Sequence, residues 1–243
     1  MFVRILSSSF CITVIVFCAL PVAAQVGVDT GLWEFVPERE HHQAIVQINS
    51  SGAFGTGVII MVDDAKPHRG GFEGYCLTAY HVVENDDDSG KIKIKYQNGE
   101  AAKDCRVIAF DKDNDVAIIW VWVPADIKPV SVADIPIEAD QYLEISGLGG
   151  GSEVECCIRH FVTSATFPTD KETIYANVAL LPGDSGGPGF NEQREVVGIV
   201  SGGWFWIDGR VKDNDGREVR TTWPARLSNT APIHQLLADL VQK

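Results

Sequence analysis

The fold of this chain is limited most by short runs of β-branched and aromatic residues, which turn-forming residues separate. Gly, Asp and Asn dominate the stretches between the runs, as in 84–90, 111–114 and 147–152. Short runs with no helical period between them are typical of an all-β sandwich or barrel and argue against a parallel α/β sheet. The runs are 44–48, 56–62, 91–96, 105–110, 116–123, 142–146, 173–178 and 196–201.

The last segment has the one clear helical pattern. Its apolar residues fall at i, i+3, i+4 and i+7 behind a proline that suits a helix start; they are Ile233, Leu236, Leu237 and Leu240, after Pro232. We therefore expect a C-terminal helix over about 231–242, which docks one apolar face on the body of the protein.

Composition excludes several classes of protein. Of 243 residues, 45% are apolar and 22% are charged, which is typical of a soluble globular chain of one or two domains. Acidic residues outnumber basic ones 33 to 20, and no stripe of Lys and Arg occurs. Without a basic footprint, nucleic acid is not an expected partner.

The N-terminus has the pattern of a secretory signal peptide. Arg4 precedes an apolar stretch over 10–20, and small residues follow as far as Ala24. A membrane anchor is the alternative, but a membrane span needs about 20 apolar residues. We expect a signal peptide over 1–24, a lead segment over 25–43, and a secreted or periplasmic domain over 44–243 with no membrane contact after cleavage.

Four cysteines remain after signal removal, and they allow three pairings. Cys156 and Cys157 are adjacent, so a bond between them would be strained. Cys76 and Cys105 lie in separate strand-like runs and could meet across a sheet in an oxidising compartment, so we expect that disulfide. The spacing contains no CxxC pair, so a structural zinc site is not expected.

The segment from Pro182 to Pro188 carries the strongest chemical signal. A serine hydroxyl needs a base to become a nucleophile, and the oxyanion that it creates needs N–H donors nearby. Gly183 allows the backbone to turn so that its own N–H and that of Ser185 face one small hollow. Ser185 is therefore the candidate nucleophile, with Gly183 and Ser185 as oxyanion donors.

One histidine and one aspartate suit the remaining roles. His81 follows a strand-like run that leads into a turn, and Asp115 precedes the apolar run 116–119. A partly buried carboxylate that holds one ring nitrogen leaves the other free to accept the serine proton. His81 is the candidate base and Asp115 the residue that orients it.

Together these segments resemble the three signatures of the trypsin-like (chymotrypsin-fold) serine proteases. They are LTAYH at 77–81, DNDVAI at 113–118 and GDSGGP at 183–188, in the chain order His, Asp, Ser. The resemblance covers about 44–242 and implies an all-β fold of two packed six-stranded antiparallel β-barrels, about 44–125 and 135–227, with the site between them. It also implies that His81 acts first as base and then as acid.

The same resemblance implies a substrate pocket. Ser201, Gly202 and Gly203 would pair with substrate backbone and form one wall. The pocket-floor position is Ala179 rather than an acidic residue, and Thr222 is expected on the far wall. Cleavage after Lys or Arg is therefore disfavoured, and a small or medium apolar residue before the scissile bond is expected.

Two features indicate which branch of the family is nearest. No convincing processing site precedes the run that starts at Ala44, so activation by a newly cut N-terminus is not expected. The strand-Gly-Thr-Gly-strand pattern over 55–60 resembles HtrA-type and other bacterial trypsin-like peptidases. HtrA proteins carry PDZ domains, whereas we expect a single protease unit here without one.

The leading hypothesis is an exported serine endopeptidase that acts on peptide or protein substrates without a cofactor or metal ion. The alternatives are a catalytically silent binding protein with the same fold and an esterase-like hydrolase. Acidic loops over 86–88 and at Asp213 and Asp215 are either solvated turns or calcium sites. The aromatic residues 204–206 either pack under the loop 207–217 or line a substrate subsite.

Overall fold

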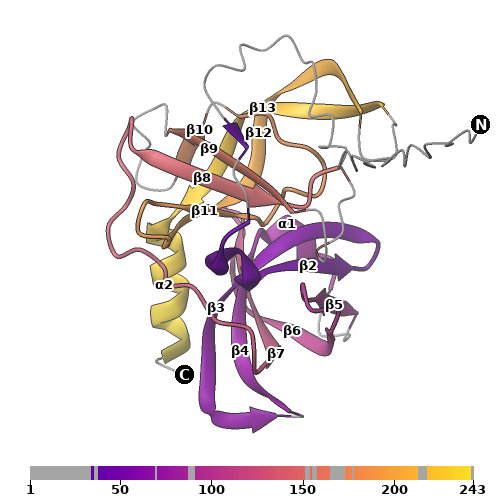
Figure 1. The fold of residues 1–243 in the computed structure, drawn as a ribbon, viewed down its shortest axis with the longest axis vertical. Coiled ribbons are helices and arrows are strands. Elements are labelled where there is room, and N and C mark those ends of the chain that lie inside the picture. Colours follow the sequence, from indigo (N-terminus) through magenta and orange to yellow (C-terminus); the bar gives the residue numbers. More distant parts are fainter. Residues whose placement is uncertain are drawn as a thin grey trace, which may run out of the picture.

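A computed structural model describes two β units and a C-terminal helix (Figure 1). The described residues are 34–35, 38–68, 70–86, 91–150, 154, 158–164, 173–176, 178–212 and 218–241, with backbone only for 34–35, 164, 204–212 and 218–223. The predicted signal peptide, both adjacent cysteines, Asp87, Asp88, Asp213 and Asp215 lie outside this part. So do the side chains of Trp204, Phe205 and Trp206.

The first unit is a closed antiparallel barrel with the strand order β2-β3-β4-β7-β6-β5. Alternating burial explains why these runs form strands: in β5, Ile92 and Ile94 fill the barrel while Lys93 is exposed. The elements are β2 (Ile45–Ser50), β3 (Ala53–His68), β4 (Gly71–Thr78), α1 (Tyr80–Val83), β5 (Ile92–Lys95), β6 (Ala101–Asp111) and β7 (Val116–Pro124).

The second unit has six antiparallel strands from the C-terminal half of the chain, joined by one strand from the N-terminal end. Its order is β1-β9-β8-β11-β12-β13-β10. The strands are β1 (Glu34–Phe35), β8 (Tyr142–Gly147), β9 (Arg159–Ser164), β10 (Thr173–Ala176), β11 (Pro188–Phe190), β12 (Val196–Lys212) and β13 (Glu218–Asn229).

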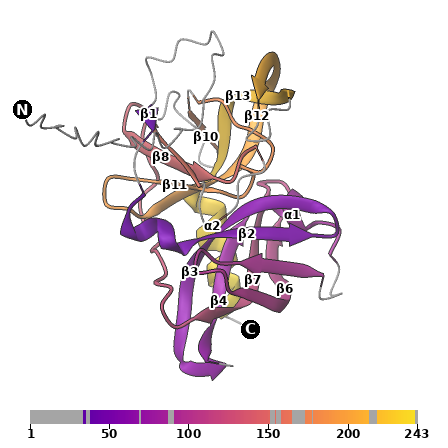
Figure 2. The same ribbon diagram turned by 45° about the vertical axis from the view of Figure 1, so that its right-hand side comes forward.

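This architecture confirms the predicted all-β fold with two six-stranded antiparallel units. Ring closure is recorded for the first unit, whereas in the described part of the second the pairing runs from β1 to β10. The N-terminal segment reaches both units: β1 pairs with β9, and the 3₁₀ helix η2 (Glu40–Ala44) leads from there into β2 (Figure 2).

The C-terminal helix α2 (Thr230–Val241) follows the second unit and packs on β6 and β7 of the first as well as on β12 and β13 of the second. The Asn229 side chain accepts a hydrogen bond from the Thr230 N–H at 2.7 Å, so this N–H at the helix start has a partner. Ile233 and Leu236 are buried with the barrel core, as the amphipathic pattern predicts. Burial of such side chains contributes about 1.5–3 kcal/mol each. No described helix is long and apolar enough to cross a membrane.

The predicted disulfide between Cys76 and Cys105 is wrong. Both are buried free thiols, and burial raises the pKa of Cys105 to about 12. Their strands are not neighbours, because β7 lies between β4 and β6: Cys76 is paired with Ile119, and Ile119 with Val107. The two runs were identified correctly as strands, but the order of strands in the barrel cannot be read from the runs.

Candidate active site

His81 and Asp115 meet at the edge of the first barrel. His81 lies in the short helix α1 directly after β4, and Asp115 lies in the turn between β6 and β7 with a positive φ of 54°. The Asp115 carboxylate accepts the His81 backbone N–H at 2.9 Å and lies 2.8 Å from His81 Nδ1. The carboxylate thus fixes both the backbone and the ring of the histidine.

A serine from the second unit completes this group. The Ser201 hydroxyl donates to Asp115 Oδ2 at 2.6 Å. Burial alone would raise the pKa of Asp115, but the hydrogen bonds from His81 and Ser201 outweigh burial and lower it. The hydrogen bond to Asp115 raises the pKa of His81, with burial opposing. With Nδ1–H directed at Asp115, the neutral ring carries its lone pair on Nε2, as a general base requires.

Ser185 lies in a loop that touches both units. Its carbonyl accepts the Thr56 N–H of β3 at 2.8 Å, and the next N–H, of Gly186, donates to Val200 of β12 at 2.7 Å. Gly186 has a φ of +83°, and a Cβ there would lie 2.1 Å from the Thr56 carbonyl oxygen. Only glycine allows so close an approach of the loop to the first barrel.

Gly55 of β3 lies against both α1 and the Ser185 loop. A Cβ on Gly55 would lie 2.8 Å from Val82, the residue after His81, and 3.0 Å from the Ser185 carbonyl oxygen. Among the described residues, Ser185 makes no hydrogen bond to the His81 ring. Contacts of this kind are often long in a free enzyme and tighten when substrate binds.

The two predicted oxyanion donors share the turn before Ser185. Gly183 has a φ of +104°, and its carbonyl accepts from the Thr56 hydroxyl at 2.7 Å. Within the described part of the chain, neither the Gly183 N–H nor the Ser185 N–H donates a hydrogen bond. Both N–H groups are therefore available to an acceptor on a ligand.

The loop is fixed by the buried carboxylate of Asp184, between these two donors. It accepts the N–H of Gly149 at 2.7 Å and of Leu181 at 2.8 Å, and it pairs with the Arg159 guanidinium at 2.9 Å. Sequence reasoning missed Arg159, since a lone arginine in a stretch without a motif gives no signal. The signal that could have indicated such a partner was Asp184 itself. An acidic residue in an otherwise apolar motif needs a cation or several N–H donors if it is buried.

The predicted pocket residues are only partly brought together. Ala179 is half-buried next to Val178, whose carbonyl accepts the Ala225 N–H at 3.1 Å. Ala225 pairs with Gly203. Ala225 therefore lies opposite Gly203 of the predicted pocket wall. Thr222 pairs with Trp206, farther along the β12–β13 hairpin.

The register also places Arg226 opposite Gly202.

The acidic loop over 86–88 was considered above as a calcium site. Its Asp86 is buried and accepts hydrogen bonds from the Ser50 and Ser51 hydroxyls. The acidic side chain of Asp86 thus fastens the loop to β2 and the turn after it.

The chain is similar to known proteases in sequence. The family model of the trypsin-like peptidase domain matches residues 55–199. A DegP-like periplasmic serine endoprotease of Halomonas elongata is 30% identical over 154 residues, which are 61% of this chain and 29% of that protein. The chloroplastic Protease Do-like 2 of Arabidopsis thaliana is 29% identical over 60% of this chain and 23% of its own length. This chain thus spans less than a third of these relatives.

Solved structures show the same fold. The serine endoprotease from Yersinia pestis has a TM-score of 0.55 at 17% identity, with 86% of this chain and 68% of that chain covered. An inactive form of Rv3671c from Mycobacterium tuberculosis has a TM-score of 0.57 at 19% identity, with 84% of this chain and 89% of that chain covered.

Proposed function

The chain belongs to the trypsin-like peptidase domain family, and we propose that it is a serine endopeptidase with Ser185, His81 and Asp115 as its catalytic triad. The observation that carries the proposal is the bonded series Ser201, Asp115, His81 beside a loop whose Gly183 and Ser185 N–H groups donate to no other described residue. Such a pairing of an oriented base with two available donors suits acyl transfer.

In the proposed reaction, the Ser185 Oγ attacks the carbonyl carbon of the scissile peptide bond while His81 Nε2 takes the hydroxyl proton. The oxyanion accepts hydrogen bonds from the Gly183 and Ser185 N–H groups. The imidazolium then gives its proton to the departing amine, which leaves an ester on Ser185. Water attacks this ester, His81 takes and returns a proton as before, and the carboxylic acid product departs.

We propose a peptide or protein substrate with a small or medium apolar residue before the scissile bond. Ala179 provides no charge at the proposed pocket floor, and Gly203 and Ala225 leave the facing walls small. Arg226 opposite Gly202 adds a cation at this edge, which further disfavours Lys and Arg as the residue before the cut.

We also propose export to the periplasm or beyond the cell. The support is the pattern of residues 1–24 together with the periplasmic relatives, such as DegP of Salmonella typhimurium at 29% identity over 60% of this chain. The chloroplastic relatives come from a different compartment, so the N-terminal pattern carries this part of the proposal. N-terminal sequencing of the exported protein should begin at Gln25.

Labelling of the purified protein with a fluorophosphonate probe, read by intact mass, tests the triad. We expect one adduct, which disappears in Ser185→Ala and in His81→Ala but persists in Ser131→Ala, a control at an exposed serine. Ser185→Ala should fold normally and lose about 10⁶ in kcat. Peptidase activity that persists in Ser185→Ala would reject the assignment, and a folded wild type without any adduct would favour a binding protein.

A further inference from the structure

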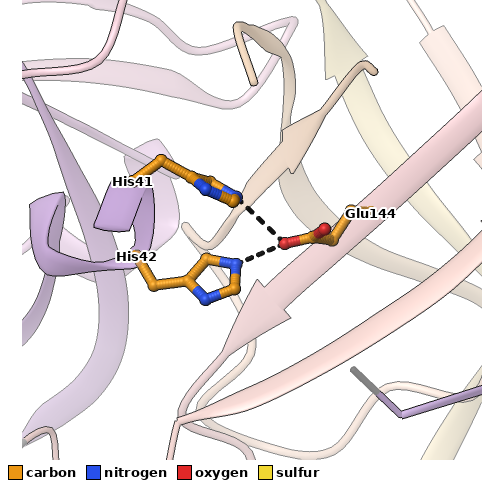
Figure 3. A group of neighbouring side chains, drawn as sticks. All are labelled: His41, His42 and Glu144. Carbon is orange, nitrogen blue, oxygen red and sulfur yellow. Dashed lines mark hydrogen bonds and ion pairs between the residues drawn. The ribbon is translucent and has the colours of Figure 1, made fainter. Parts of the chain in front are cut away.

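A second histidine–carboxylate cluster joins η2 of the N-terminal segment to β8 of the second unit (Figure 3). We name it the histidine clamp: His41 and His42 of η2, Glu144 of β8 and His160 of β9. His41 Nε2 lies 3.1 Å from Glu144 Oε1, and His42 Nε2 bonds to the same oxygen. The other oxygen accepts from Tyr142 at 2.9 Å and from the Arg39 guanidinium at 3.3 Å.

The hydrogen bonds of the clamp define its protonation. The Arg39 backbone N–H donates to His42 Nδ1 at 2.9 Å, so Nδ1 carries a lone pair and the ring proton is on Nε2, directed at Glu144. Burial lowers the pKa of His42, although the hydrogen bond to Glu144 opposes this. Burial alone would raise the pKa of Glu144, but the bonds from His41 and His42 outweigh it and lower the pKa. Glu144 is thus a carboxylate with four donors, which are His41, His42, Tyr142 and Arg39.

The same geometry does not suit a metal ion, although His41, His42 and Glu144 bring three possible ligand atoms together. A histidine that binds a metal through Nε2 normally keeps its proton on Nδ1 and donates it. In His42 that proton would point at the Arg39 N–H, which already occupies the position. The cluster is therefore a set of hydrogen bonds that hold the N-terminal segment against β8.

The clamp also touches the two strands on either side of β8. The His160 ring stacks on His42 with centroids 3.6 Å apart, and its Nδ1 lies 2.8 Å from the Ser146 hydroxyl of β8. Phe190 of β11 meets the edge of His41 at 4.8 Å. Three strands of the second unit therefore pack against η2.

These strands also hold the oxyanion loop. His160 is the direct neighbour of Arg159, which pairs with Asp184. β8 leads to Gly149, whose N–H donates to the same carboxylate. A Cβ on Gly187 would lie 2.1 Å from the Ser146 carbonyl oxygen, so the loop after Ser185 rests directly on β8.

From these contacts we propose that the histidine clamp positions the oxyanion loop, with His42 as a positioning residue that acts through Arg159 and Asp184. This inference rests on the proposed triad. Without the histidines, the buried Glu144 loses two of its four donors, and β8 and β9 must shift to find others. A misplacement of about 1 Å in a catalytic donor can cost about 100-fold in rate.

The test compares variants of His42 with a control in the same 3₁₀ helix. His42→Ala removes both hydrogen bonds of the ring, whereas His42→Gln keeps an N–H donor for Glu144. Glu40→Gln removes only an exposed ion pair of the same helix, that with Lys128. We expect kcat on a peptide substrate to fall about 10- to 100-fold in His42→Ala with little change in KM. Partial recovery is expected in His42→Gln, and Glu40→Gln should match the wild type.

Each rate is measured well below the melting temperature of that variant, so that loss of folded protein does not enter. Should His42→Ala fail to fold, His41→Gln provides the milder change. A double-mutant cycle with Arg159→Lys tests the route: the loss in the double variant should be smaller than the sum of the single losses.

A folded His42→Ala with wild-type kcat, or additive losses in the cycle, would overturn the proposal. So would a rise in melting temperature on addition of Zn²⁺ that His42→Gln abolishes, since the cluster would then be a metal site. Absence of Ser185-dependent activity in the wild type would instead reject the triad, and the clamp proposal with it.

Discussion

Asp115 and Glu144 are two carboxylates that each bind histidine, but the histidines differ in their exposure to solvent and therefore in the role that they can play. The His81 side chain beside Asp115 is 41% exposed, whereas the His42 side chain beside Glu144 is 0% exposed. The pKa of His81 is raised by its partner, and that of His42 is lowered by burial. An imidazole with one side open to solvent can exchange protons with a substrate, whereas a sealed one serves as a fixed donor.

Loss of charge at Asp115 should break the open pair with the largest effect on rate. In Asp115→Asn the ring of His81 is no longer held in the tautomer that leaves Nε2 free, so kcat should fall about 10⁴-fold while the fold persists. Steady-state kinetics and a circular dichroism melt check both halves of this expectation. A loss of less than about tenfold would show that another group orients His81.

Removal of the carboxylate from the buried pair, Glu144 with His42, should affect mainly the stability of the fold. Glu144→Ala leaves His41, His42, Tyr142 and Arg39 without their shared acceptor, and each buried donor left unsatisfied typically costs about 1–3 kcal/mol of unfolding free energy. Urea unfolding of the wild type and the variant measures it. Asp115→Asn is the comparison, and the contrast fails if both substitutions destabilise the protein equally.

A smaller effect is expected from Ser201, which touches only the open pair. Ser201→Ala removes one hydrogen bond to a charged group, which is worth about 1.5–3 kcal/mol. Part of this loss should appear as a lower kcat and part as a pH profile shifted to higher pH, because Asp115 then holds the imidazolium more strongly. An unchanged pH profile would mean that the Ser201 hydroxyl does not affect the proton affinity of Asp115 and His81.

The two sites should give stability opposite pH dependences. Burial lowers the pKa of His160 in the clamp to about 3 from an ordinary 6.5, so the unfolded chain binds more protons and stability falls as pH drops through that window. The raised pKa of His81 stabilises the fold at low pH, and this contribution is lost as pH rises through the folded-state value.

Melting temperatures of wild type, His160→Phe and His81→Phe between pH 4 and pH 8 separate the two contributions. His160→Phe should flatten the acid side of the curve, and His81→Phe should steepen it. Parallel curves for all three proteins would contradict the assignment.

Short-range patterns in the sequence predicted local structure: the alternation within β5 marks its buried face, and the structure brings His81 and Asp115 of two separate motifs together. The catalytic roles of His81, Asp115 and Ser185 stay predictions. Contacts between distant segments were missed. The His41–Glu144 contact spans 103 positions, and the pairing of Arg159 with Asp184 joins the start of β9 to the loop before Ser185, two segments without a shared pattern.

The expected disulfide was wrong because it assumed that two strands were adjacent, and strand order is a property of the closed barrel. The substrate-pocket residues stay predictions. Thr222 pairs with Trp206 in the β12–β13 hairpin, whose bulges in β12 could not be read from the sequence. Ser201, predicted as a pocket wall, also bonds through its hydroxyl to Asp115.

The helix α2 has a consequence for how the molecule folds. It follows the second unit along the chain, yet Ile233 and Leu236 are buried with the core of the barrel that precedes that unit, while β1, which precedes the barrel, extends the second sheet. Each unit thus depends on a segment from beyond its own stretch of chain, so neither is expected to be fully stable if expressed alone. The two units should melt in a single cooperative step, and the first barrel should reach its full stability only after α2 has been made.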